Sequence, residues 1–162
     1  MKPFLRWRDD WLLGLDELDA QHLALAELLN GIHDSLSAGG TESGFSSDAY
    51  RRLLDLAEMT REHFRDEEHV MRDQGYPGLG DHHREHALLL AELQDLIRHI
   101  EEGTREFTMQ TLIALKHWQI DHVLNSDREF AEYCRRHTEK ELATRLTSAS
   151  RQPSPVSHHS IH

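Results

Sequence analysis

The stretch HHREHALLLAELQDLIRHI, residues 82–100, carries the hydrophobic pattern that decides the fold. A stripe recurs in it every three or four residues and comprises His82, His86, Leu89, Leu93, Leu96 and Ile100. Residues at this spacing share one face of an α-helix. The stretch therefore predicts a helix over about 81–102, with two histidines on its buried face.

Three further segments show the same helical period, and no segment shows the alternation of a strand. They cover about 19–37, with Asp19 as the expected N-cap, 47–74 and 108–125. The Gly/Ser-rich residues 38–47 are typical of a loop. Connections this short favour antiparallel neighbours. The expected fold class is all-α, an antiparallel up-down-up-down four-helix bundle.

The two ends of the chain extend this bundle. A leader with Trp7, Trp11 and Leu12 is expected to pack across it. After Asp127, an amphipathic run towards Leu146 predicts a short additional C-terminal helix. One domain is expected over 1–146, and the Ser/Pro/His-rich residues 147–162 predict a disordered tail.

The length, charge and cysteine content of the chain exclude several classes of function. The chain has 162 residues, 29 acidic against 18 basic, and a formal net charge of −11. Such a surface repels phosphate backbones, so nucleic-acid binding is excluded as a working hypothesis. There is no apolar run of about 20 residues, so no membrane insertion is expected. A single cysteine, Cys134, and no apolar signal-peptide core favour the cytoplasm.

Side chains able to bind metal recur on the core-facing side of all four predicted helices. They are His22, His63, Glu67, His82, His86, His122 and Asp127. One such histidine alone would be better interpreted as an ordinary core residue, but the seven positions taken together favour a site. Four ligands saturate a single zinc ion, whereas magnesium and calcium prefer oxygen ligands. Five imidazoles and two carboxylates therefore favour a two-metal centre, with iron the leading candidate.

The spacing of the last pair carries a structural prediction. His122 and Asp127 are five residues apart, which separates them by about 140° on a straight helix. Both can reach one centre only if the helix breaks or loosens between them. Asn125 and Ser126 are weak helix formers and mark the expected place.

Four motifs give the chain a family resemblance. LDAQH (18–22), HFRDEEHVM (63–71), YPGLGDHHREH (76–86) and WQIDHVLNSD (118–127) follow one another through the predicted helices. In these motifs the chain resembles the hemerythrins, in particular the single-domain bacteriohemerythrins. The resemblance spans most of residues 5–135 and leaves out the tail.

The resemblance implies a non-haem di-iron centre (Fe2+/Fe3+) with an oxo or hydroxo bridge and dioxygen as its ligand. It implies that His82, His86 and His122 hold one iron. His22 and His63 would hold the other, which keeps the open position, and Glu67 and Asp127 would bridge both. It also implies an apolar dioxygen pocket walled by Leu25, Phe64, Trp118, Val123 and Leu124.

The function implied is reversible dioxygen binding, for storage, delivery or buffering, without enzymatic turnover. A protein acceptor of the oxygen is a possible partner. An oxygen, redox or iron sensor acting through a partner stays open, as does weak oxidative di-iron chemistry. Ferritin-like oxidases use Glu-x-x-His pairs, and this chain has none. His83 is expected to face solvent, and Glu68 to have a supporting or surface role.

Overall fold

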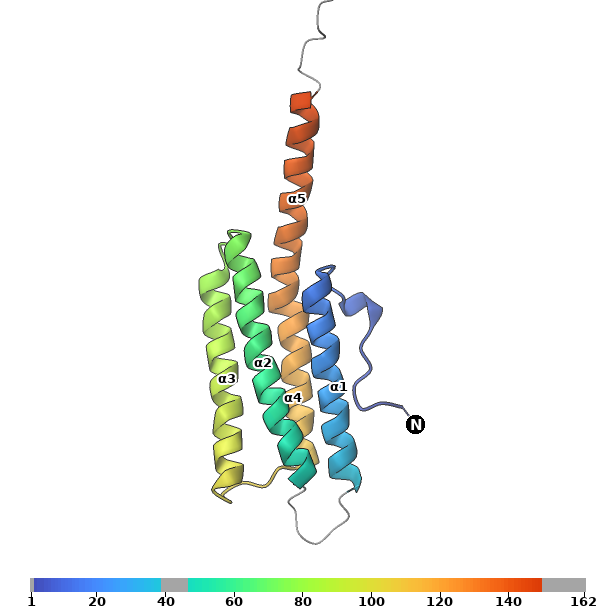
Figure 1. Cartoon of the computed structure of the whole chain (residues 1–162), viewed down its shortest axis with the longest axis vertical. Coiled ribbons are helices and arrows are strands. Elements are labelled where there is room, and N and C mark those ends of the chain that lie inside the picture. Colours follow the sequence, from blue (N-terminus) through green and yellow to red (C-terminus); the bar gives the residue numbers. More distant parts are fainter. Residues whose placement is uncertain (1, 39–46, 150–162) are drawn as a thin grey trace, which may run out of the picture.

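The structure is a computed structural model that describes residues 2–38 and 47–149. Four helices run alternately up and down: α1 (Asp16–Ala38), α2 (Ser47–Asp73), α3 (Leu79–Glu101) and α4 (Met109–His122) (Figure 1). Helix α1 packs against α2 and α4, and α2 packs against α3. The predicted four-helix bundle is confirmed.

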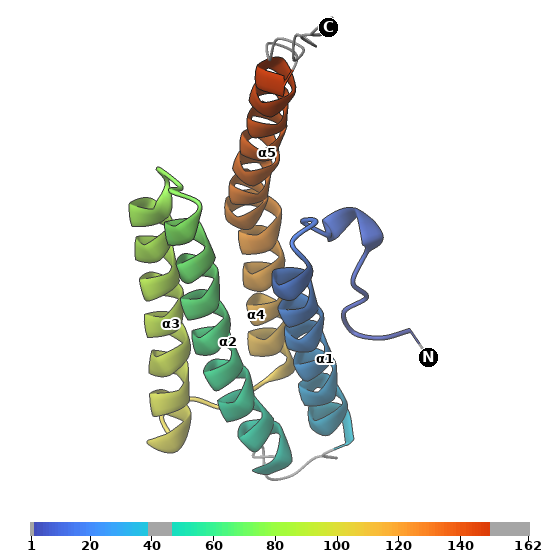
Figure 2. The ribbon, with the colours of Figure 1, turned by 45° about the horizontal axis from the view of Figure 1, so that its top comes forward.

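The chain continues from α4 without a turn. A five-residue π-helix, η2 (Val123–Asp127), leads into α5 (Arg128–Ala149). Helix α5 has 22 residues, so it is longer than the short helix expected, and its last part extends beyond the bundle (Figures 1 and 2). The boundary predicted at residue 147 falls within α5. The rest of the expected tail, 150–162, and most of the expected loop, 39–46, lie outside the described residues.

The prediction that Asp19 caps the first helix is wrong. Helix α1 begins at Asp16, so Asp19 lies inside its first turn. Its carboxylate instead accepts hydrogen bonds from the backbone N–H groups of Leu13 and Gly14, at 2.8 and 3.0 Å. Gly14 has φ 79°, a left-handed conformation that glycine adopts readily. The carboxylate thus ties the preceding turn to the helix start.

The leader packs against the bundle, as predicted. Residues before and after Arg6 make the contacts. Leu5 is buried, and it exchanges two hydrogen bonds with the side chain of Asn30, at 2.7 and 2.9 Å. Trp7 and Trp11 pack against the core, whereas Leu12 is exposed. The leader includes a single 3-10 turn, η1 (Asp9–Trp11).

Two apolar clusters fill the interior. The larger includes Leu25 of α1, Leu56 of α2, Leu93 of α3 and Leu112 of α4. The smaller consists of Leu18, Met71, Phe130 and Cys134, with Leu79 packed against it. Along α1, α2, α3 and the continuous segment from α4 into α5, the predicted metal-binding residues fall in sequence between residues of one cluster and residues of the other. The polar site is therefore a layer enclosed between two hydrophobic layers.

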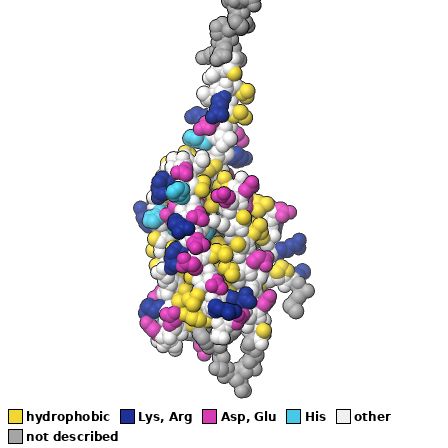
Figure 3. Space-filling model, viewed as in Figure 1, with side chains coloured by type: hydrophobic (Ala, Val, Ile, Leu, Met, Phe, Trp, Pro, Cys, Tyr) yellow, Lys and Arg dark blue, Asp and Glu magenta, His cyan; other side chains and the backbone are white. Residues whose placement is uncertain are grey.

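The outer surface is charged and mixed. On the face drawn in Figure 3, acidic and basic side chains are interspersed with apolar ones over the bundle. None of the described helices combines the length and apolar character needed to cross a bilayer.

Candidate metal centre

The seven residues predicted from the sequence come together in the polar layer. All are buried, and the most exposed, His122, retains 5% of its accessible surface. Burying this many ionisable groups is unfavourable unless they are paired or bind cations. The local reason for their convergence is helical spacing, because residues four apart, such as His63 and Glu67, face the same side of a helix.

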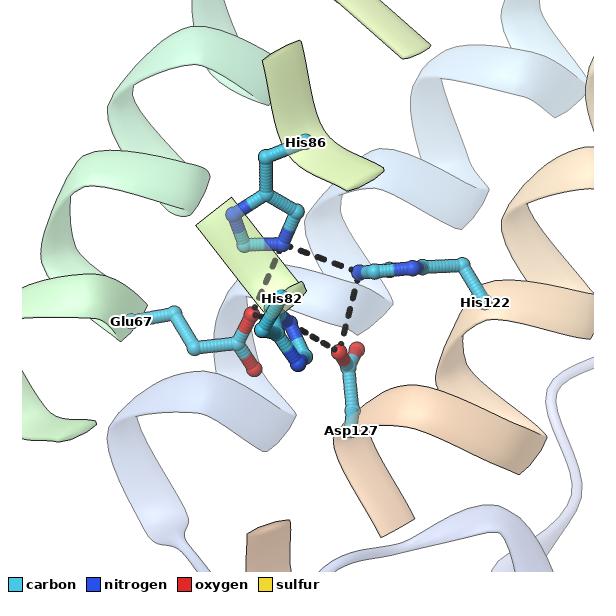
Figure 4. A group of neighbouring side chains, drawn as sticks. All are labelled: Glu67, His82, His86, His122 and Asp127. Carbon is cyan, nitrogen blue, oxygen red and sulfur yellow. Dashed lines mark hydrogen bonds and ion pairs between the residues drawn. The ribbon is translucent and has the colours of Figure 1, made fainter. Parts of the chain in front are cut away.

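The seven side chains form two overlapping groups of potential ligand atoms. One consists of Glu67, His82, His86, His122 and Asp127, and Figure 4 shows these side chains directed at a common centre. The other consists of His22, His63, Glu67 and Asp127. Within each group the ligand atoms lie within 4.8 Å of one another. The two carboxylates belong to both groups, and carboxylates are suited to bridging two cations.

The imidazole nitrogens meet at short distances. The Nε2 atoms of His86 and His122 are 2.9 Å apart, and those of His22 and His63 are 3.0 Å apart. The Nε2 atoms of His22, His82 and His122 lie 3.0–3.2 Å from a carboxylate oxygen of Asp127. Despite these distances, neither Asp127 oxygen makes a hydrogen bond of acceptable geometry to another described residue.

The π-helix brings His122 and Asp127 to the same centre. The backbone loosens over Val123–Asp127, a segment that includes the Asn125 and Ser126 singled out from the sequence. The wider turn of a π-helix places residues five apart on one side. The prediction that the helix must loosen here is confirmed.

Three of the histidines are held from outside the cluster through Nδ1. His63 donates to Oε1 of Gln21 at 2.7 Å, and His122 donates to Oε1 of Glu85 at 2.8 Å. His86 donates to Oε1 of Glu68, also at 2.8 Å. Such contacts fix the proton on Nδ1, so that each Nε2 directs a lone pair into the cluster.

Of these outer partners, the sequence indicated only one. Glu68 was expected to have a supporting or surface role, and it contacts both His86 and the exposed His83. Gln21 and Glu85 were missed. Gln21 lies next to His22 in sequence but holds a histidine of another helix. Glu85, on α3, contacts His122 at the end of α4 and Ser126 in η2.

The electrostatics of the cluster reflect burial and mutual contact. Burial lowers the pKa of His63 to about 3 and that of His86 to about 2. Burial would also lower the pKa of His82, but its contacts with Asp127 and Glu67 raise it to about 9. Burial and the neighbouring Asp127 raise the pKa of Glu67. The pKa values of the clustered imidazoles therefore shift in opposite directions, because burial disfavours the charged form of each ring while nearby carboxylates favour it.

The arrangement of nitrogen and oxygen atoms in the cluster is better suited to binding metal cations than to sharing protons. In His86 and His122 the Nδ1 atoms already donate outwards, so the two facing Nε2 lone pairs repel unless a positive charge lies between them. Glu67 Oε1 is buried and has no hydrogen-bond partner among the described residues. A nitrogen-rich donor set with two carboxylates suits transition metals such as iron rather than magnesium or calcium.

A small cavity adjoins one end of the cluster. Its volume is about 20 Å³, above the roughly 10–15 Å³ that a single water needs. It is lined by Leu25, Phe64, Trp118 and Val123, together with Leu29, Leu56, Thr60, Leu93, Leu115, Gln119 and three histidines, His22, His63 and His122. The predicted pocket residue Leu124 is not among the described residues that line it. Val123 is 2% exposed, whereas Leu124 is only partly buried.

Comparison with known proteins identifies the family of the chain and agrees with its fold. The chain matches the family model described as the hemerythrin HHE cation binding domain over residues 13–134, so it belongs to that family. A bacteriohemerythrin of Stenotrophomonas maltophilia is 25% identical over 82% of this chain and 83% of its own length. One from Clostridium acetobutylicum is 28% identical, over 78% and 98% respectively.

A myohemerythrin and a solved hemerythrin structure are also similar to this chain. The myohemerythrin of Riftia pachyptila is 27% identical over 76% of this chain and 88% of its own. A crystal structure of wild-type hemerythrin superposes with a TM-score of 0.72 at 23% identity, covering 80% of this chain and 96% of that one. At that identity, the structural match establishes the bundle alone.

Proposed function

We propose that this chain binds two iron ions in the polar layer and binds dioxygen reversibly beside them. The observation that carries the proposal is the pair of overlapping ligand groups that share Glu67 and Asp127. His82, His86 and His122 would hold one iron, and His22 and His63 the other. Two iron ions held there would supply the electrons that reversible dioxygen binding requires.

The position of the cavity supports an open coordination site at one particular metal. The cavity is lined by His22 and His63, the two histidines of the less crowded group. His122 also reaches it, whereas His82 and His86 are not among the described lining residues. A small ligand in the cavity would therefore approach the metal that has only two histidines.

The surroundings of the cavity suit a binding protein more than an enzyme. Most of its lining side chains are apolar, and it holds little more than one water-sized molecule. Exclusion of water slows proton and anion access, and so slows irreversible oxidation of bound iron. This closure supports a role in storing, delivering or buffering dioxygen.

The test is a metal analysis combined with optical spectra of the reduced protein, recorded first without and then with dioxygen. Two irons per chain, and a visible absorption band that appears with dioxygen and disappears on its removal, are expected. Irreversible oxidation would favour a sensor or oxidative enzyme. One zinc ion per chain would overturn the proposal.

One observation favours a second candidate, an oxygen or redox sensor acting through a partner. Asp127 ends the π-helix, and α5 begins at the next residue and extends beyond the bundle (Figure 2). A change at the centre could thus be relayed directly to an exposed helix. Hydrogen exchange in α5 should then differ between the deoxygenated and oxidised forms, whereas equal exchange would favour simple binding.

A further inference from the structure

Gln119 is a polar residue in the largely apolar lining of the cavity. It belongs to neither group of potential metal ligands, so the histidine cluster does not explain its presence. It lies on α4 one turn before His122, so both face the same side of the helix. Only 6% of its surface is exposed. Its side chain lines the cavity together with Leu25, Phe64 and Trp118.

The amide nitrogen of Gln119 is left without a hydrogen bond. Nε2 is buried and finds no partner among the described residues. A buried donor in this state costs free energy, and native proteins retain few of them. A leucine or methionine would fill the same space without that cost. The amide is therefore best explained by a partner that enters the cavity.

We propose that Gln119 is the hydrogen-bond donor to the exogenous ligand that occupies the cavity. The inference rests on the proposed function, since it requires a metal on the His22 and His63 side. The ligand class is a small molecule that presents a negatively charged lone-pair acceptor when bound. It is either dioxygen, which gains negative charge on binding, or a small anion such as azide, which already carries it. Hydrogen bonds to charged acceptors are stronger than those to neutral ones.

The location of the amide makes it selective for polar or charged ligands. Of the residues that line the cavity, the histidines would use their inner nitrogens on metal, and most of the others are apolar. An N–H group in such a water-poor space interacts more strongly with developing charge than it would in solvent. Gln119 would thus stabilise a polar bound ligand relative to an empty cavity.

Azide binding to the iron-loaded, oxidised full-length protein tests this role. Gln119→Met keeps the length of the side chain and removes the donor, and Gln110→Leu, at an exposed position of the same helix, is the control. We expect azide affinity to fall at least about tenfold in Gln119→Met and to be unchanged in the control. The azide stretching band should differ between water and heavy water in the parent and lose that difference in Gln119→Met.

A second readout does not depend on ligand binding. Without azide, iron-loaded Gln119→Met should have a higher midpoint of chemical denaturation than the parent, because a buried donor without a partner has been removed. An unchanged or lower midpoint would mean that the amide is already satisfied, which overturns the inference. Two irons per chain with equal azide affinity in parent and variant would overturn only the role of Gln119. A parent without iron would overturn the proposed function itself.

Discussion

His122 Nε2 lies 3.0 Å from Asp127 Oδ1, although the two residues are five positions apart in one continuous helical segment. The π-helix between them makes this contact possible. Ser126, inside the π-helix, donates a hydrogen bond to Glu85 at 2.6 Å, and Glu85 also accepts from His122. The loosened turn and the orientation of His122 are therefore fixed by one carboxylate on α3.

Replacing His86 by alanine should lower the metal content from two ions per chain towards one. Its Nε2 lies 2.9 Å from that of His122 and 3.2 Å from Glu67 Oε2, so its loss removes one donor from the three-histidine group. The control is His83→Ala, because the His83 side chain is 65% exposed and belongs to neither ligand group. Metal analysis of purified protein checks both variants. Two ions retained in His86→Ala would contradict its role as a ligand.

Glu68→Ala should weaken metal binding about 10- to 100-fold while leaving all proposed ligands in place. Glu68 accepts from Nδ1 of His86 at 2.8 Å, and this contact orients the ring and keeps Nε2 free of a proton. Glu62→Ala, at an exposed position of the same helix, provides the control. Competition with a chelator measures both affinities. Equal affinities would show that Glu68 does not support the site.

The fold and the inward-facing residues could be predicted because both depend on local spacing. The pairs His63 and Glu67, and His82 and His86, are four residues apart, and helical geometry alone puts each pair on one face. The need for a loosened turn before Asp127 followed from the same geometry. Helical geometry and the apolar stripes together placed these groups in the core.

The parts that escaped prediction depend on which helices are neighbours. That Gln21 holds His63, or that Glu85 holds His122, follows from the packing of separate helices and leaves no periodic signal in the sequence. Leu124 is not among the described residues that line the cavity, and the path of the π-helix, which helical spacing alone does not specify, decides which residue faces inwards. The partnerless Nε2 of Gln119 could be recognised only once the cavity was located.

Replacing Trp118 by alanine should speed oxidation of the dioxygen-bound protein several-fold without changing its iron content. Trp118 lines the cavity and its ring lies 6.1 Å from that of Phe64. Its removal would open the apolar wall and admit water and anions. Trp11→Ala, in the leader, is the control. The rate of loss of the oxygenated spectrum measures the effect, and equal rates in both variants would remove Trp118 from the proposed protective role.

The free energy of unfolding of the metal-free protein should be greatest near pH 6.5 and fall on both sides. Below that pH, unfolded histidines take up protons, whereas folded His63 and His86, with pKa values of about 3 and 2, stay neutral. The unfolded state then binds more protons, so stability falls as the pH is lowered from 6.5 towards 3. Above pH 6.5 the folded state binds more protons through His82, whose pKa is about 9. That contribution is lost as the pH rises from 6.5 through 9.

Chemical denaturation in the presence of a chelator, over a series of pH values, measures this profile. His82→Gln should reduce the decline on the alkaline side, because the group with a pKa of about 9 is gone. Part of the decline should remain, because contacts with Asp127 and Glu85 outweigh burial and raise the pKa of His122 as well. The exposed variant His83→Gln should keep the parent profile. Bound metal should make the free energy of unfolding less dependent on pH on the acid side, because ligation competes with protonation of the same nitrogens. This effect should end at the pH at which protons displace the metal. A metal-free profile that is level between pH 5 and 9 would contradict the depressed and raised histidine pKa values together.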